Sequence, residues 1–263
     1  MSERVNIISG FYGQIEEDKR LEKSRHGQLE YRTTMEYVHR YAKKGDKILE
    51  VGAGTGRYSI ALAKEGFDVT AVELVESNLD VLKKNSEGVA NIEAYQGDAL
   101  NLDRFKDGEF DVTLVFGPMY HLYEKADVLK AIDEAMRVTK KGGIVLFAFL
   151  SVYAILFDNY LNDRMVAGIE ENFDKDYKIR HFEEQLFTGY DIVEFENLFE
   201  KRNVEHLSTV AVDSVMELVS NNTDFASLTD EGFEAFVKYH LATCETRELL
   251  GCSSHLLYIC KTK

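Results

Sequence analysis

Short apolar runs alternate with amphipathic stretches between about residues 46 and 150. The amphipathic stretches, such as 128–136, carry apolar residues at helical spacing, and 77–84 is predicted as a helix with Ser77 as its N-cap. Strands that alternate with helices predict βαβ units, and therefore a parallel sheet covered by helices on both faces. The runs with the length and composition of buried strands are 47–51, 68–72, 91–96, 111–116 and 144–149.

The flanks of this core show a different pattern. Residues 10–42 have a helical pattern, and residues 151–200 are rich in aromatic and acidic side chains and also favour helices. Residues 204–212 and 255–260 alternate like strands, with a predicted helix over 229–250 between them. We therefore expect a single domain over 1–263: a helical cover over 1–44, a core over 45–150, and cover helices with the last strands over 151–263.

Charge and composition exclude several classes of function. The chain of 263 residues has 31 basic and 46 acidic residues, a net charge of −15, and no Lys/Arg cluster. A protein that holds nucleic acid through its phosphates needs a basic face, so nucleic acid is disfavoured, as is an anionic membrane surface. The most apolar run, 143–157, is shorter than the roughly 18–20 residues that span a bilayer.

The start of the chain and its cysteines bear on location and metals. The start, MSERVNIISG, lacks the features of a signal peptide. Three widely spaced cysteines form neither a disulfide framework nor a zinc site. We expect a cytoplasmic protein without a metal, either a monomer or a homodimer.

A glycine-rich segment, EVGAGTGR at 50–57, follows the first predicted strand and precedes a helix. Glycine lets the backbone approach a ligand closely, and the helix N-terminus offers free N–H groups to it. The dinucleotide fingerprint G-x-G-x-x-G would need glycine where Arg57 stands, and the P-loop pattern is absent. A nicotinamide cofactor is therefore disfavoured.

The spacing Glu-x-Gly-x-Gly-x-Gly resembles motif I of the class I S-adenosylmethionine-dependent methyltransferases. Further matches follow in order: Glu73 ends the second strand, Gly97-Asp98-Ala99 follows the third, and 110–116 runs into a Gly-Pro loop. The segment 137–143 then leads into the fifth strand. This resemblance covers about residues 45–150 and implies a Rossmann-like, doubly wound, seven-stranded and mostly parallel sheet.

The resemblance also implies an S-adenosylmethionine site, with S-adenosylhomocysteine as product. Glu50 would lie near the amino group of the cofactor, Glu73 would accept from both ribose hydroxyls, and Asp98 would accept from the adenine amino group. Structural alternatives stay open, namely capping of nearby N–H groups by Glu50 and a turn role for Asp98. The other cofactor positions within the core are Gly52, Ala53, Gly54, Gly56, Leu74, Ala99, Leu100, Phe116 and Gly117.

The loop after the fourth strand carries Pro118, the single proline of the chain. In the family that it resembles, this loop presents the methyl acceptor, so we expect Pro118, Met119, Tyr120 and His121 to bind substrate. His121 is a candidate general base and Tyr120 a candidate orienting group, unless both pack under the following helix. The Asp/Asn-Pro-Pro-aromatic pattern of enzymes that methylate nucleobase amino groups is absent.

Two segments are candidate covers for the site. Tyr12 and Arg25, in the N-terminal part, are candidates to close over the cofactor, with a solvated helix face as the alternative for that part. His181, within 176–190, is a candidate substrate contact, although a surface excursion also fits that segment.

The predicted function is methyl transfer from S-adenosylmethionine to an O, N or S nucleophile of a small molecule. Three alternatives remain: a methyltransferase acting on tRNA, rRNA or protein; a nicotinamide-dependent oxidoreductase; and a non-enzymatic S-adenosylmethionine-binding protein, because binding residues need not imply turnover.

Overall fold

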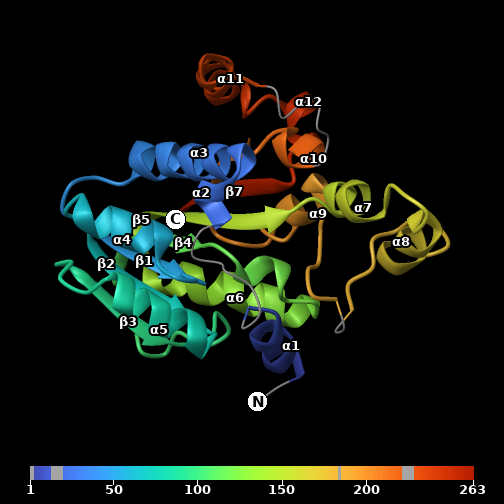
Figure 1. Ribbon diagram of the computed structural model, residues 1–263. Coiled ribbons are helices and arrows are strands. Elements are labelled where there is room, and N and C mark those ends of the chain that lie inside the picture. The colour runs from blue at the N-terminus through green and yellow to red at the C-terminus, as the bar shows by residue number, and fades with distance from the viewer. Residues whose placement is uncertain (1–2, 13–19, 183–184, 221–227) are drawn as a thin grey trace.

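The computed structural model describes residues 3–12, 20–182, 185–220 and 228–263 (Figure 1). Its strands form one seven-stranded sheet in the order β3-β2-β1-β4-β5-β7-β6. The bounds of the strands are β1 Lys47–Val51, β2 Asp68–Glu73, β3 Ile92–Gln96, β4 Phe110–Val115, β5 Thr139–Leu150, β6 Val204–Ala211 and β7 His255–Thr262.

Strands β1 to β5 pair in parallel, whereas β7 runs antiparallel to both of its neighbours, β5 and β6. The predicted α/β class and mostly parallel sheet are therefore confirmed. Because β7 lies between β5 and β6, the sheet combines strands from the core and from the last third of the chain.

Helices cover both faces of the sheet, with α3 and α6 on opposite sides in Figure 1. The first half of the chain contains α1 Glu3–Tyr12, α2 Arg20–Lys23, α3 Arg25–Tyr41, α4 Arg57–Lys64, α5 Glu76–Asn85, the 3-10 turn η2 Pro118–Tyr120 and α6 Lys125–Val138. The second half contains α7 Val152–Tyr160, α8 Met165–Asn172, α9 Ile192–Asn197, α10 Met216–Ser220, α11 Asp230–Thr243 and α12 Arg247–Leu250. Within the described residues, no helix combines the length and the apolar content needed to cross a bilayer.

Several local predictions need correction. The helix predicted from Ser77 begins at Glu76 with Val75 as its N-cap, so Ser77 lies inside the first turn. Within 151–200 the segment between α8 and α9 is not helical where it is described, and 229–250 divides into α11 and α12. These boundaries depend on packing with distant segments, which a local pattern does not record.

The carboxyl ends of the parallel strands meet at one edge of the sheet. His255, the first residue of β7, lies at the same edge because β7 is antiparallel and His255 pairs with Leu150 at the end of β5. The helix α3 begins at Ser24, whose side chain accepts a hydrogen bond from the Gly27 amide at 3.1 Å. Glu30 and Thr34 of this helix face the same edge, where the structure has its main cavity.

Candidate functional site

A cavity of about 1180 Å³, its open mouth included, lies at the carboxyl edge of the sheet. The structure brings most of the predicted site residues together here, although Tyr12 and His121 are far apart in the chain. The predicted residues that line the cavity are Tyr12, Glu50, Gly52, Ala53, Gly54, Glu73, Leu74, Asp98, Ala99, Phe116, Gly117, Pro118, Tyr120 and His121.

Three predicted residues of the core do not line this cavity. Gly56 is the N-cap of α4 with a φ of +89°, and an added Cβ would lie 2.8 Å from Leu82, so its role is to form the turn. Met119 is fully buried in the hydrophobic core. Leu100 is partly buried and packs against that core, so its side chain is not part of the cavity wall either.

The two predicted cover residues Arg25 and His181 also lie elsewhere. Arg25 forms an ion pair with Asp230 at 2.5 Å, and its guanidinium lies over the Phe233 ring at 4.5 Å, so its charge is used at the contact with α11. His181 contacts the Thr188 hydroxyl at 2.5 Å and Glu194 at 3.1 Å, beside a separate cavity. Neither residue lines the main cavity, because each contacts a segment that local sequence patterns do not connect to it.

Glu73 is held firmly at the cavity wall. Its Oε2 accepts a hydrogen bond from the Gly54 amide at 2.7 Å, and its Oε1 accepts one from the Val75 amide at 2.9 Å. Each carboxylate oxygen has a second lone pair, so the group can accept further bonds from a ligand. The glycine loop and Glu73, which the family resemblance singled out, are therefore joined directly by a hydrogen bond.

Asp98 has a partner that the sequence analysis missed. Its Oδ1 accepts from the Leu100 amide at 3.1 Å, and Oδ2 forms an ion pair with Arg4 of α1. Arg4 is largely buried and lines the cavity. No local pattern signals this contact, because Arg4 lies 94 positions before Asp98.

Glu50 is buried and accepts a hydrogen bond from the Ser59 hydroxyl. Burial, with a smaller contribution from the nearby Glu73 charge, raises the pKa of Glu50 to about 8. A carboxyl with this pKa is mostly protonated at neutral pH, so the cavity wall carries less negative charge than its four acidic side chains suggest.

The raised pKa of Glu50 predicts a pH-dependent stability. Between pH 4.5 and about 8 the unfolded chain has lost this proton while the folded protein keeps it, so stability falls as the pH rises through that window. Glu50→Gln does not titrate, and we expect it to be more stable than wild type by a few kcal/mol above pH 8. The difference should shrink toward pH 5. Thermal unfolding between these pH values tests this, with the exposed Glu36→Gln as control; equal curves at all pH values would contradict it.

The hydrogen-bond partners of His121 define its tautomer. The Leu186 carbonyl, 2.7 Å away, only accepts, so Nδ1 carries the proton, and Nε2 accepts from the Tyr12 hydroxyl at 3.1 Å. Burial lowers the pKa of His121 to about 4, so the ring is neutral at neutral pH. The His121 ring therefore links α1 to the loop after β4 through its hydrogen bond with Tyr12.

The far end of the cavity was missed by the sequence analysis. Glu30 of α3 is buried and forms a bidentate pair with Arg20 at 2.7 and 2.9 Å, and both residues line the cavity. His255 comes from the other end of the chain, with apolar neighbours such as Leu256 and Leu257. Helical periodicity marks Glu30 only as one polar position in a helix, and His255 is marked only as the start of a strand.

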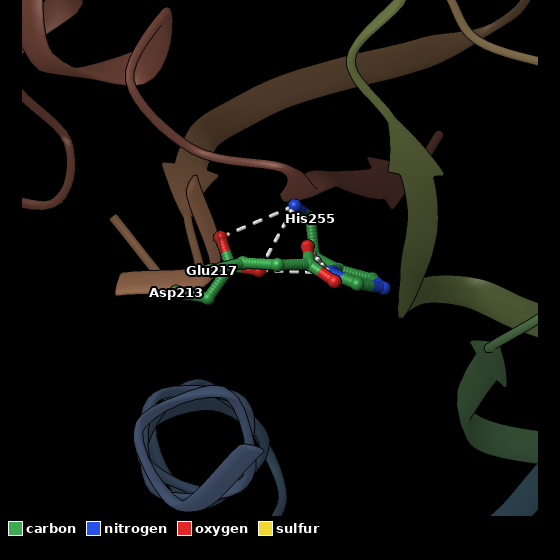
Figure 2. Close-up of side chains that lie close together, drawn as sticks. All are labelled: Asp213, Glu217 and His255. Carbon is green, nitrogen blue, oxygen red and sulfur yellow. Dashed lines mark hydrogen bonds and ion pairs between the residues drawn. The ribbon is translucent and has the colours of Figure 1, made fainter. Parts of the chain in front are cut away.

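His255 belongs to a cluster with Asp213 and Glu217 (Figure 2). Its Nδ1 lies 2.8 Å from Asp213 Oδ2 and 3.5 Å from Glu217 Oε2. Within the part of the chain that the structure describes, one donor atom from each of the three lies within 4.8 Å of the others, a grouping that can hold a cation. The carboxylates Glu30, Asp213 and Glu217 outweigh burial and raise the pKa of His255 well above its usual value, so a proton holds the cluster together.

Comparison with known proteins agrees with this geometry. Residues 48–143 match the family model of a methyltransferase domain. The chain is 33% identical over 137 residues to a putative methyltransferase of Geobacillus sp. (strain WCH70), covering 51% of this chain and 54% of that one. It is 37% identical over 128 residues to a demethylmenaquinone methyltransferase of Staphylococcus aureus, covering 44% and 51%. The chain thus spans about half the length of the curated relatives it matches.

A solved structure has the same fold. It is a SAM-dependent methyltransferase of Thermotoga maritima, described as a possible histamine N-methyltransferase, with a TM-score of 0.57 and 18% identity over 98% of this chain and 99% of that one. The sheet and the glycine loop define a Rossmann-like methyltransferase fold. The chain is therefore similar to S-adenosylmethionine-dependent methyltransferases in its domain at 48–143 and in its fold.

Proposed function

We propose that the protein transfers the methyl group of S-adenosylmethionine to an O, N or S nucleophile of a small molecule and releases S-adenosylhomocysteine. One observation carries this proposal. The glycine loop, Glu73 and Asp98 line the same cavity as Tyr120 and His121 of the loop after β4. Such a cavity can hold a donor and a small acceptor side by side.

The residues fit the cofactor. A bound S-adenosylmethionine supplies a methyl group on a positively charged sulfur. Glu73, oriented by the Gly54 and Val75 amides, would accept from the ribose hydroxyls, and Glu50 would lie near the amino group. Asp98 would accept from the adenine amino group after exchanging or sharing its contact with Arg4.

Positioning is expected to supply much of the rate, because methyl transfer needs nucleophile, carbon and sulfur in line. We propose that Tyr120 and His121 act at this step, since both line the cavity after β4. His121, neutral and bonded to Tyr12, would hold the N-terminal helix over the acceptor. With a pKa of about 4 it is a weak base, so an acceptor that reaches the site already deprotonated or as a free amine suits it best.

Three observations favour a small molecule over a nucleic acid or protein. The helices α1, α2 and α3 contribute Ile8, Leu21 and Thr34 to the wall of the cavity, and the net charge of −15 opposes a polyanionic substrate. One of the relatives is a demethylmenaquinone methyltransferase, whose name indicates a small-molecule substrate. A cytoplasmic monomer or homodimer remains our expectation.

Cofactor choice gives a direct test. We expect calorimetry to show binding of S-adenosylhomocysteine and no binding of NAD, because Arg57 replaces the third glycine of the dinucleotide fingerprint. The opposite result would support the oxidoreductase alternative. A protein that binds S-adenosylhomocysteine but transfers no labelled methyl group to a library of small amines, phenols, carboxylates and thiols would instead be a non-enzymatic binder.

A further inference from the structure

The side chains of Tyr120 and His121 stand on a very short element. The 3-10 turn η2 has three residues, and its backbone bonds run from the Tyr120 amide to the Gly117 carbonyl at 3.3 Å and from the His121 amide to the Pro118 carbonyl at 3.0 Å. Turns of this kind have poorer hydrogen-bond geometry than an α-helix. The acceptor loop, residues 117–121, therefore needs another segment to hold both side chains in one orientation.

Residues 186–190, the anchor segment, contact the acceptor loop through their backbone. The Thr188 amide donates a hydrogen bond to the Tyr120 carbonyl at 2.9 Å. The Leu186 carbonyl accepts one from Nδ1 of His121 at 2.7 Å. The two residues proposed to act in methyl transfer are therefore each bonded to a position of the same short segment.

The anchor segment is fixed to the sheet at its other end. The Tyr190 amide donates to the carbonyl of Leu150, the last residue of β5, at 2.9 Å, and the Tyr190 carbonyl accepts from the Val152 amide at 3.1 Å. Gly189 packs so closely here that an added Cβ would lie 2.6 Å from Cα of Val152. Because the glycine loop follows β1 of the same sheet, the anchor segment holds the acceptor loop at a fixed position relative to the cofactor end of the cavity.

The half-buried Phe187 ring lies between these two backbone contacts. Its centroid is 5.0 Å from that of His121 and 6.2 Å from that of Tyr120, and the ring of Phe11 in α1 meets it edge to face at 5.5 Å. These separations lie within the range of favourable aromatic contacts. Phe187 itself does not line the cavity. It can therefore act on a bound acceptor only through Tyr120 and His121, which do.

From these contacts we propose that Phe187 is a positioning residue for methyl transfer: its ring, fixed by the anchor segment, holds His121 and Tyr120 in the orientation in which they face the acceptor. Methyl transfer needs nucleophile, carbon and sulfur in line, so a small rotation of these side chains would misplace the acceptor. The anchor segment lies between β5 and β6, outside the stretch 48–143 that matches the methyltransferase family model. The inference rests on the proposed function, because it concerns the acceptor end of the same site.

Phe187→Ala tests the proposal, with Phe182→Ala as the matched control. Phe182 is also half-buried, but its ring contacts the Arg180 guanidinium at 5.6 Å and makes no ring contact with the acceptor loop among the described residues. The measured quantity is the rate of S-adenosylhomocysteine formation from saturating S-adenosylmethionine and the library of small amines, phenols, carboxylates and thiols. We expect Phe187→Ala to lower this rate at least about tenfold, because a misplaced acceptor reacts slowly. Calorimetry should show that its affinity for S-adenosylhomocysteine stays within about twofold of wild type. Phe187→Tyr keeps the ring and should recover most of the rate, and Phe182→Ala should match wild type.

The His121 ring gives a readout that a loss of stability alone would not change. In wild-type protein with ¹⁵N-labelled histidine, His121 should show the single tautomer with its proton on Nδ1, set by the Leu186 carbonyl, whereas Phe187→Ala should show a mixture of both tautomers. The proposal is overturned if Phe187→Ala keeps the wild-type rate, or if its His121 keeps the single tautomer. Wild-type protein that binds S-adenosylhomocysteine and methylates nothing in the library would instead contradict the proposed function, and the His121 signals would then decide the positioning role alone.

Discussion

Glu73→Ala is expected to weaken the binding of S-adenosylhomocysteine by about 100-fold, close to 2.7 kcal/mol. The carboxylate is nearly buried, and both of its oxygens are already aligned by the Gly54 and Val75 amides. A ribose diol would add two hydrogen bonds to a charged acceptor, each worth about 1.5–3 kcal/mol. Alanine removes all of these interactions.

Calorimetry of the purified variant measures the effect. The matched control is Glu76→Ala, three positions later on the exposed face of α5, which removes the same charge from a position outside the cavity wall. Because Glu73 also supports two backbone amides, circular dichroism should first show that the variant is folded. An affinity within threefold of wild type in a folded Glu73→Ala protein would remove Glu73 from the ribose site.

Gly52→Ala is expected to lower the stability of the fold by about 3 kcal/mol or more. Gly52 has a φ of +82°, and an added Cβ would lie 2.4 Å from the Phe116 carbonyl oxygen and 2.6 Å from Cδ of Pro118. The first contact is with backbone at the end of β4, so it can be relieved only by moving the acceptor loop. For a chain of this size such a loss lowers the melting temperature by about 6–12 °C.

Gly45→Ala is the control that separates two causes of lost stability in Gly52→Ala, namely the clash of the added Cβ and the strain of a positive φ. Gly45 also has a positive φ, of +90°, but an added Cβ would meet nothing within 4 Å. We expect it to cost about 1 kcal/mol, the strain of the left-handed conformation alone. Similar melting temperatures for the two variants would show that the glycine loop and the acceptor loop are not in close contact.

The sheet core could be predicted because its signal is local. Each strand of β1 to β5 is a short apolar run, and the glycines that follow β1 appear as a spacing within eight residues. Glu73 and Asp98 both line the cavity, because the ends of parallel strands meet at one edge of the sheet. Their roles toward the cofactor remain proposals.

Of the predicted cover residues, Tyr12 lines the cavity, whereas Arg25 and His181 do not. Arg25 and His181 were expected at the site because their segments were candidate covers, and in the structure they contact Asp230 and Glu194 instead of lining the cavity. Arg4 was not considered, although its ion pair with Asp98 places α1 at the cofactor end of the cavity. A charged side chain can pair with any opposite charge that folding brings near it, so its partner cannot be inferred from its own neighbourhood in the chain.

The amino-acid sequence by itself determined the parallel core and the position of the glycine loop, because these follow from periodicity and spacing, and its resemblance to a known family singled out the acids at the strand ends. Which residues line the far end of the cavity was decided only by the tertiary structure. Glu30 and His255 meet there because α3 packs near the carboxyl edge and β7 enters the sheet antiparallel between β5 and β6. That insertion brings residues more than two hundred positions apart to one wall. Long-range pairing of this kind is a property of the folded chain and has no counterpart in local sequence patterns.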